Sequence, residues 1–164
     1  MKKNLIFLAG LMTVVTLGIT SCFSSNAVSK NELSQAVKKQ IEERNFTIEV
    51  TRMLPMNGRS SELTSLYSLT VNNDAIDSHL PYSGTGYSVP YGGGQGLTFK
   101  APITVYTEKF DSKGTADISF QTRSEDDNYH YRIQIFTNGS SSIHVTPNNR
   151  QAISFYGNLK MKEE

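Results

Sequence analysis

The chain has 164 residues, a formal net charge of +1 at pH 7 and one cysteine, Cys22. A single cysteine excludes a framework of intramolecular disulfides, so a hydrophobic core has to stabilise the fold. The nearly balanced charge gives no excess of Lys and Arg with which to hold phosphates, and no nucleic-acid partner is expected.

The first residues have the layout of a bacterial lipoprotein signal. Two lysines precede an apolar run over 5–19, and Ser21 places a small residue directly before Cys22. A helix that spans a bilayer needs about 20 apolar residues, and this run is shorter. We therefore expect residues 1–21 to be a cleaved signal peptide and Cys22 to carry the lipid. An ordinary signal peptide or an anchor helix with a chance cysteine is the alternative.

Removal of residues 1–21 leaves 143 residues with 14 basic and 15 acidic side chains. One domain is expected, because a chain of this length buries about 70% of its unfolded surface without disulfides. Residues 22–28 are short and mostly polar, which predicts a lipid-anchored tether before a domain over 29–164. Since no acidic cluster follows Cys22, we expect an anchor in the outer membrane that faces the periplasm. The membrane is then a partner through the lipid.

A helix is predicted over 29–44. Ser29 and Glu32 have the spacing of a capping box, in which each side chain accepts a hydrogen bond from a backbone amide. Apolar residues recur at steps of three and four, at Leu33, Ala36, Val37 and Ile41. The polar face mixes Lys and Glu, whereas a helix that lies on a membrane usually has a basic polar face. The helix is therefore expected to pack on a sheet.

After the helix the apolar period changes to two, which is typical of strands with one buried face. Three such segments are predicted, over 46–50, 67–71 and 75–80. Pro55 and Gly58 break the chain between the first two. The domain is therefore expected to be mainly β after its first helix.

The segments after residue 100 predict antiparallel hairpins whose loop lengths follow from parity. Opposed residues point to the same face, so a one-residue slip would move every apolar side chain into water. Ile133 faces Ile143 only across an odd loop, and a three-residue loop that ends at Gly139 satisfies this condition. The other expected loops are 111–114, 124–127 and 148–150. The expected pairs are Ile133–Ile143, Tyr131–Val145, Phe120–Tyr131, Ile118–Ile133, Val105–Phe120, Val145–Ile153 and Ile143–Phe155.

These elements predict a mainly β fold, in which an antiparallel meander of about seven or eight strands follows one amphipathic helix. The sheet is expected to curl into a barrel, and a sandwich is the alternative. Charged side chains on the polar face argue against the interpretation of this sheet as an outer-membrane pore. That face is expected to meet water or a ligand.

Several short segments resemble a known family. They are Asn73-Asp74-Ala75, Leu80-Pro81-Tyr82 followed by Gly84 and Tyr87, Leu97-Thr98-Phe99, and Tyr156-Gly157. They are similar to a family of small Bacteroidetes lipoproteins known only as a domain of unknown function, over most of the mature domain. The resemblance implies a single β-rich domain in a cell envelope, and it assigns no catalytic residue.

The candidate titratable groups are His79, His130 and His144. The predicted register places Arg132 opposite His144, so these two residues and His130 form a weak alternative site on the polar face. A zinc site needs three or four ligands, and a neighbouring cation opposes metal binding, so no metal is expected. The glycine-rich stretches lack the residues that complete a nucleotide loop, and no cofactor is expected. The acidic turn at 126–127 is interpreted as solvated rather than as a calcium site.

Tyr82, Tyr87 and Tyr91 lie in an irregular segment over 80–96, among glycines and prolines. A tyrosine offers an apolar ring and a hydroxyl, so these residues are the candidates for binding a small ligand or an envelope protein. The alternative is that they plug an open end of the sheet.

Two functional classes stay open. The leading hypothesis is a non-catalytic binding module of the cell envelope with an unknown ligand or partner. The alternative is an envelope-associated hydrolase that uses His130 or His144 with a carboxylate such as Asp117. The sequence has no G-x-S-x-G elbow and no second cysteine, so an enzyme would lack a recognisable nucleophile.

Overall fold

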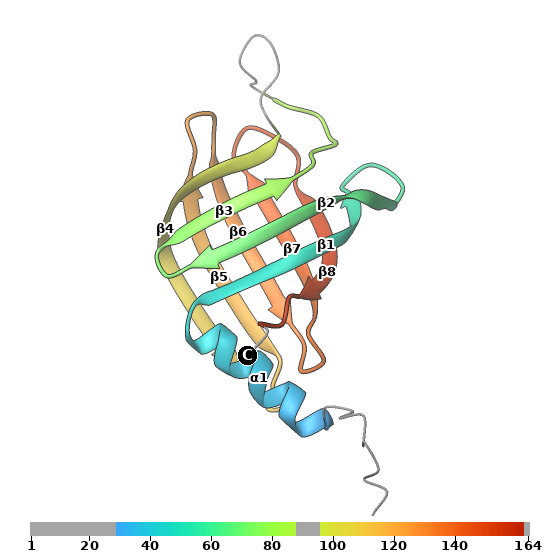
Figure 1. The fold of residues 1–164 in the computed structure, drawn as a ribbon. Helices are drawn as coiled ribbons and strands as arrows, with labels where there is room; N and C mark the ends of the chain where they lie inside the picture. The colour runs from blue at the N-terminus through green and yellow to red at the C-terminus, as the bar shows by residue number, and fades with distance from the viewer. Residues whose placement is uncertain (1–28, 88–95, 163–164) are drawn as a thin grey trace, which may run out of the picture.

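The computed structural model describes residues 29–87 and 96–162, which form a closed antiparallel barrel with one helix at one end (Figure 1). The elements are α1 (Lys30–Glu42), β1 (Asn45–Pro55), β2 (Ser61–Asn72), β3 (Ala75–Leu80), β4 (Leu97–Phe110), β5 (Ala116–Arg123), β6 (Asn128–Ile135), β7 (Ser140–Pro147) and β8 (Ile153–Leu159). Each strand pairs with the next, and β8 pairs with β1. The expected mainly β, barrel-like fold is confirmed. Cys22 and Tyr91 lie outside the described residues.

The helix α1 begins at the predicted capping box and covers one end of the barrel (Figure 1). The Glu32 amide donates to the Ser29 hydroxyl at 3.2 Å, and the Ser29 amide donates to the Glu32 carboxylate at 2.8 Å. Val37 and Ile41 are buried in the same cluster as the barrel interior, so the expected packing of the helix on the sheet is confirmed. Across residues 29–87 and 96–162, no helix has both the length and the apolar character needed to cross a bilayer.

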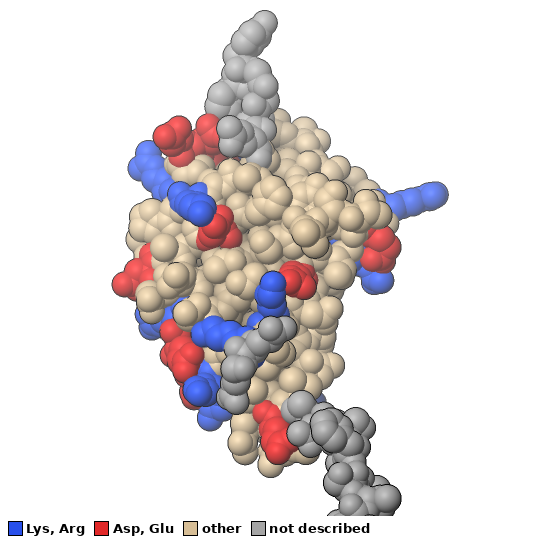
Figure 2. All heavy atoms as spheres, viewed as in Figure 1, with Lys and Arg blue, Asp and Glu red and all other residues tan. Residues whose placement is uncertain are grey.

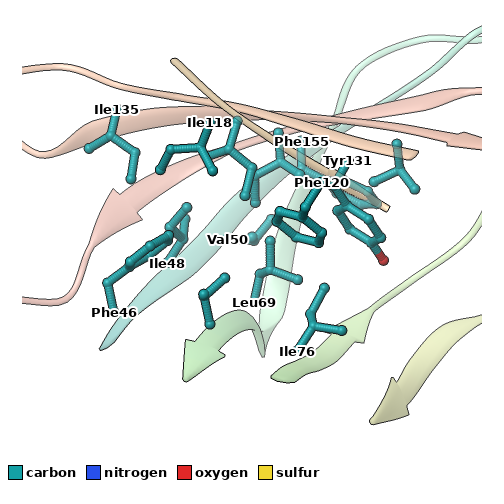
Figure 3. Close-up of a cluster of buried hydrophobic side chains, with 14 of the residues drawn as sticks. Phe46, Ile48, Val50, Leu69, Ile76, Ile118, Phe120, Tyr131, Ile135 and Phe155 are labelled. Atoms are coloured by element: carbon teal, nitrogen blue, oxygen red, sulfur yellow. The ribbon is translucent and has the colours of Figure 1, made fainter. Parts of the chain in front are cut away.

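Apolar side chains from all around the barrel fill its interior (Figure 3). The side chains labelled there are Phe46, Ile48, Val50, Leu69, Ile76, Ile118, Phe120, Tyr131, Ile135 and Phe155. The phenol of Tyr131 lies in this core, 3.3 Å from the Ser78 hydroxyl, which donates to the Leu97 carbonyl at 2.6 Å. Burial raises the pKa of Tyr131, so its hydroxyl stays protonated. Because side chains occupy the interior, the barrel presents its ends and its outer face to ligands.

The predicted register of the last four strands is confirmed. Ile133 pairs with Ile143, and Gly139 closes the three-residue loop between them with a φ of 83°. A positive φ is accessible to glycine at little cost, which is why this loop type ends in glycine. The other confirmed pairs are Tyr131–Val145, Phe120–Tyr131, Ile118–Ile133, Val145–Ile153 and Ile143–Phe155.

The predicted pairing of Val105 with Phe120 is wrong, because β4 carries a bulge at Val105. The Val105 side chain is 68% exposed, and its φ is 52°. A bulge adds one residue to a strand and shifts the positions that face inward. Tyr106 takes the inner position instead, and its ring stacks on Phe120 with centroids 6.3 Å apart. The connection to β5 therefore runs over 111–115 rather than 111–114.

A second bulge, in β1 between Val50 and Arg52, lies beside Gly157 of β8. A Cβ atom at Gly157 would collide with the Glu49 carbonyl oxygen and would lie 3.0 Å from the Val50 Cα atom. The two backbones approach so closely here that the position requires glycine. Closure of the barrel between β8 and β1 therefore depends on this residue.

Candidate functional site

The segment 81–87, which carries the candidate residues Tyr82 and Tyr87, lies at the end of the barrel opposite α1 (Figure 1). This loop end comprises residues 81–87, the β5–β6 turn at 124–127 and the β7–β8 connection at 148–152. The segment 85–87 lies along the connection at 149–151: Gly86 forms a β-bridge with Arg150, and the Gln151 amide donates to the Thr85 carbonyl at 3.0 Å. Backbone hydrogen bonds therefore hold the segment in place.

Tyr82 is half-buried and packs against the hydrophobic core. Its hydroxyl donates to the Gln151 carbonyl at 3.0 Å, and the Arg150 guanidinium lies over its ring, 5.6 Å from the centroid. Burial raises the pKa of Tyr82, and the positive charge of Arg150 partly opposes this shift. Tyr82 thus covers part of the loop end and fixes the neighbouring connection.

Tyr87 differs from Tyr82 because its ring faces solvent and is 69% exposed. Its amide donates to the Asn149 carbonyl at 2.7 Å, so the exposed ring stands on an ordered backbone. The structure brings Tyr82 and Tyr87 to the same end of the barrel, while Tyr91 lies outside the described residues. A binding role for the three tyrosines stays a prediction.

The interpretation of residues 126–127 as a solvated turn is wrong for Asp127, whose side chain is buried. The carboxylate of Asp127 accepts hydrogen bonds from the amides of Asn128 at 2.8 Å, Asn148 at 3.2 Å and Asn149 at 3.0 Å. A buried carboxylate needs such donors to offset its lost hydration. Asp127 therefore ties the β5–β6 turn to the β7–β8 connection.

The weak alternative site lies on the outer face of the barrel, where Arg132 pairs with His144 as predicted. The His130 Nε2 atom lies 2.8 Å from the Ser119 hydroxyl, and the His144 Nδ1 atom lies 2.9 Å from the Ser154 hydroxyl. Partial burial lowers the pKa of His144, and the charges of Arg132 and His130 lower it further. The face therefore holds two separate Ser–His contacts.

The carboxylate that the enzyme hypothesis needs lies elsewhere. Asp117 accepts a hydrogen bond from the Gln134 amide nitrogen at 2.7 Å. This pair lies one row along the sheet from the row that holds Ser119 and Arg132. His79 stacks on Tyr67 with centroids 5.4 Å apart. Within the described residues, no three or more His, Cys, Asp or Glu side chains are grouped so as to hold a metal ion.

A shallow groove on the outer face was not predicted. It has a volume of about 530 Å³ and lies on β6, β7, β8 and β1. We call it the outer groove and define it by Gln134, Phe136, Ser140, Ser142, Tyr156 and Asn158. The alternation predicts that the outward face meets water or a ligand, but it does not by itself locate a groove on that face. The predicted register nevertheless places Phe136 and Tyr156 on the outward face, and two large aromatic residues there are the signal that could have revealed it.

Charges of both signs are mixed on the face of the protein shown in Figure 2. This mixture leaves the face without the large field of one sign that attracts polyanions. The protein also has exposed ion pairs, such as Lys100 with Asp77 at 2.8 Å and Lys160 with Glu49 at 3.3 Å. Such pairs contribute little to stability.

The model of a family described as a domain of unknown function, DUF4251, matches residues 29–159. The chain belongs to the DUF4251 family. Its barrel is similar to the crystal structure of a DUF4251 family protein from Bacteroides eggerthii DSM 20697, with a TM-score of 0.61 and 16% sequence identity. The likeness covers 79% of this chain and 87% of that chain, and at this identity it shows a shared fold. No curated protein matches this DUF4251 chain.

Proposed function

We propose that this DUF4251 protein is a lipid-anchored, non-catalytic binding module of the cell envelope. Residues 1–21 would be removed as a signal peptide, and Cys22 would carry the lipid. The tether over 22–28 spans at most about 25 Å when fully extended. The membrane would therefore lie near α1, which the chain enters directly after the tether.

The observation that carries the proposal is the exposed Tyr87 ring at the loop end. With the anchor near α1, the loop end points away from the membrane, where a small ligand or an envelope protein can reach it (Figure 1). Backbone hydrogen bonds already fix the segment that bears Tyr87. Binding there would therefore not lose the free energy needed to order a flexible loop. Aromatic rings presented in this way are typical of recognition surfaces.

Photo-crosslinking in cells tests this orientation. We expect Tyr87→p-benzoylphenylalanine to give a defined adduct, because the ring faces the side from which a ligand or partner approaches. The matched control is Lys113→p-benzoylphenylalanine, in the exposed β4–β5 connection at the α1 end, which should give none. The neighbouring Phe110 ring lies 5.5 Å from the Lys38 ammonium of α1, which places this connection at that end.

Equal adduct yields at the two positions, or no adduct at residue 87, would contradict recognition through the loop end. Thermal melts of Tyr87→Ala provide the folding control. Because the ring is exposed, its removal should change the free energy of unfolding by no more than about 0.5 kcal/mol.

The alternative is an envelope hydrolase, and the hydrogen bond between Ser119 and His130 is the observation that favours it. A serine nucleophile needs a base within hydrogen-bond reach and a third group that orients the base. A fluorophosphonate reagent separates the two functions: labelling of Ser119 would support the hydrolase, and an unlabelled protein would support the binding module.

A further inference from the structure

The six residues that define the outer groove come from β6, β7, β8 and the β6–β7 connection, and the register of these strands fixes the order of their side chains. Ser142 of β7 pairs with Gln134 of β6 on one side and with Tyr156 of β8 on the other. Residues paired in this way point to the same face of the sheet. A small hydroxyl side chain therefore lies between an amide and an aromatic ring.

The next row of the groove, one step toward α1, has the reverse arrangement. Ser140 pairs with Asn158 of β8, and on its other side the Phe136 amide donates to the Ser140 carbonyl at 2.9 Å. In this row the aromatic residue, Phe136, lies on the β6 side of β7, and the amide residue, Asn158, lies on the β8 side. Spacings of about 4.8 Å between strands and about 6.8 Å between alternate residues place the Cα atoms of Phe136 and Tyr156 about 12 Å apart, diagonally across the groove.

Both aromatic rings are available to a ligand. Phe136 is 45% exposed and Tyr156 is 42% exposed, while the serines between them are too small to cover the sheet. The result is a groove with an apolar surface at two opposite corners and hydroxyl and amide groups between them. Apolar faces combined with a few placed polar groups are the general composition of ligand sites.

Arg52 is the one charged side chain among the residues that line the groove, and its guanidinium donates to the Glu62 carboxylate at 2.6 Å. The Asp117 carboxylate of the neighbouring strand β5 accepts a hydrogen bond from the groove residue Gln134 at 2.7 Å. Glu49 pairs with Asn158 in the sheet, and its carboxylate lies 3.3 Å from the Lys160 ammonium. The groove therefore offers neutral donors and acceptors rather than a net charge, which favours a neutral ligand over an anionic one.

We propose that the outer groove binds a neutral oligosaccharide. A sugar ring presents an apolar face of C–H groups, which packs on an aromatic ring, and a rim of hydroxyls, which donate to and accept from Ser, Gln and Asn side chains. Two aromatic residues whose Cα atoms lie about 12 Å apart would be contacted together by more than one sugar unit, so the ligand is an oligosaccharide rather than a monosaccharide. This inference goes beyond recognition at the loop end and rests on different residues.

The sheet keeps the groove preformed. Every strand that contributes to it is paired on both sides, because the barrel is closed. The close approach of β1 to Gly157 fixes the backbone next to Tyr156. A site built on strands of a closed sheet holds its side chains more rigidly than a loop does, which lowers the cost of binding.

Isothermal titration of the full chain, held in a detergent without a sugar headgroup, against chitopentaose, cellopentaose and maltopentaose tests the proposal. Heat-induced melting of the same preparation first establishes that the chain is folded. We expect at least one of these neutral sugars to bind with a Kd of about 1 mM or tighter. Oligogalacturonate, which carries carboxylates, should bind at least about tenfold more weakly, because the groove offers it no unpaired cation.

Variants connect binding to the groove. Phe136→Ala and Tyr156→Ala should each weaken binding by about tenfold through loss of a stacked ring, without lowering the melting temperature. Tyr87→Ala, which removes an exposed ring at the loop end, should leave the affinity unchanged. Ser142→Leu should abolish binding by filling the floor between the rings, whereas Thr146→Leu, also outward on β7, should not.

Failure of all three neutral sugars to bind would overturn the proposal, as would binding that survives loss of either groove ring. Sedimentation tests a second occupant. A wild-type dimer that Tyr156→Ala converts to a monomer, together with no sugar binding, would assign the groove to a second copy of the chain. Each of these results leaves recognition at the loop end unaffected, since that proposal depends on the crosslink at residue 87.

Discussion

Val145→Asp is expected to unfold the barrel, whereas Thr146→Asp should unfold with nearly the wild-type midpoint. Val145 has no exposed surface, and it pairs with Tyr131 and Ile153 inside the core. An isolated carboxylate there loses its hydration and finds no partner among the apolar side chains. The cost should exceed about 5 kcal/mol, which is comparable with the whole stability of a small domain.

The adjacent position is the matched control because it carries the same substitution on the other face of β7. Thr146 is exposed and pairs with His130, so a carboxylate there remains hydrated. Urea titrations of both variants, followed by circular dichroism, measure the difference. Similar midpoints for the two would mean that β7 has the wrong register in the sheet.

Gly157→Ala is expected to destabilise the protein by about 3 kcal/mol or more. The added Cβ would overlap the Glu49 carbonyl group, and backbone atoms cannot move aside as a flexible side chain does. Either β8 separates from β1 or the bulge in β1 rearranges, and both changes weaken closure of the barrel. Urea unfolding gives the loss of stability, and amide hydrogen exchange in β1 and β8 locates it.

Gly58→Ala serves as the control for this glycine. In the turn between β1 and β2, a Cβ atom at Gly58 would lie 3.5 Å from the Pro55 Cβ atom, which is an ordinary van der Waals contact. We expect a change of no more than about 0.5 kcal/mol. A Gly157→Ala variant as stable as Gly58→Ala would contradict the close approach of β8 to β1.

Parity explains why most of the sheet was predictable from sequence. Alternation along β6, β7 and β8 restricts each loop to an odd or even length, and Gly139 then selects one loop type. The capping box at Ser29 likewise fixes the start of α1. The bulge at Val105 was not predictable, because the alternation before it makes Val105 the next inward residue after Ile103. The structure instead turns Val105 outward and packs Tyr106 against the core.

The candidate site was less predictable because its contacts join segments that are distant in sequence. Nothing local to Asp127 indicates that the amides of Asn148 and Asn149 surround its carboxylate. The two tyrosines of the same short segment also have opposite exposures, since one meets Gln151 and the other meets solvent. Part of the outer groove could be predicted from sequence, because the register that buries Phe155 also turns Tyr156 outward.

Mass spectrometry of the amino terminus, on protein purified from its native membranes, tests the proposed anchor most directly. We expect the mature chain to begin at Cys22 with acyl chains attached, and Cys22→Ser to retain residues 1–21 without acylation. A wild-type protein that begins at any other residue, or that begins at Cys22 without acyl chains, would contradict a lipid-anchored module.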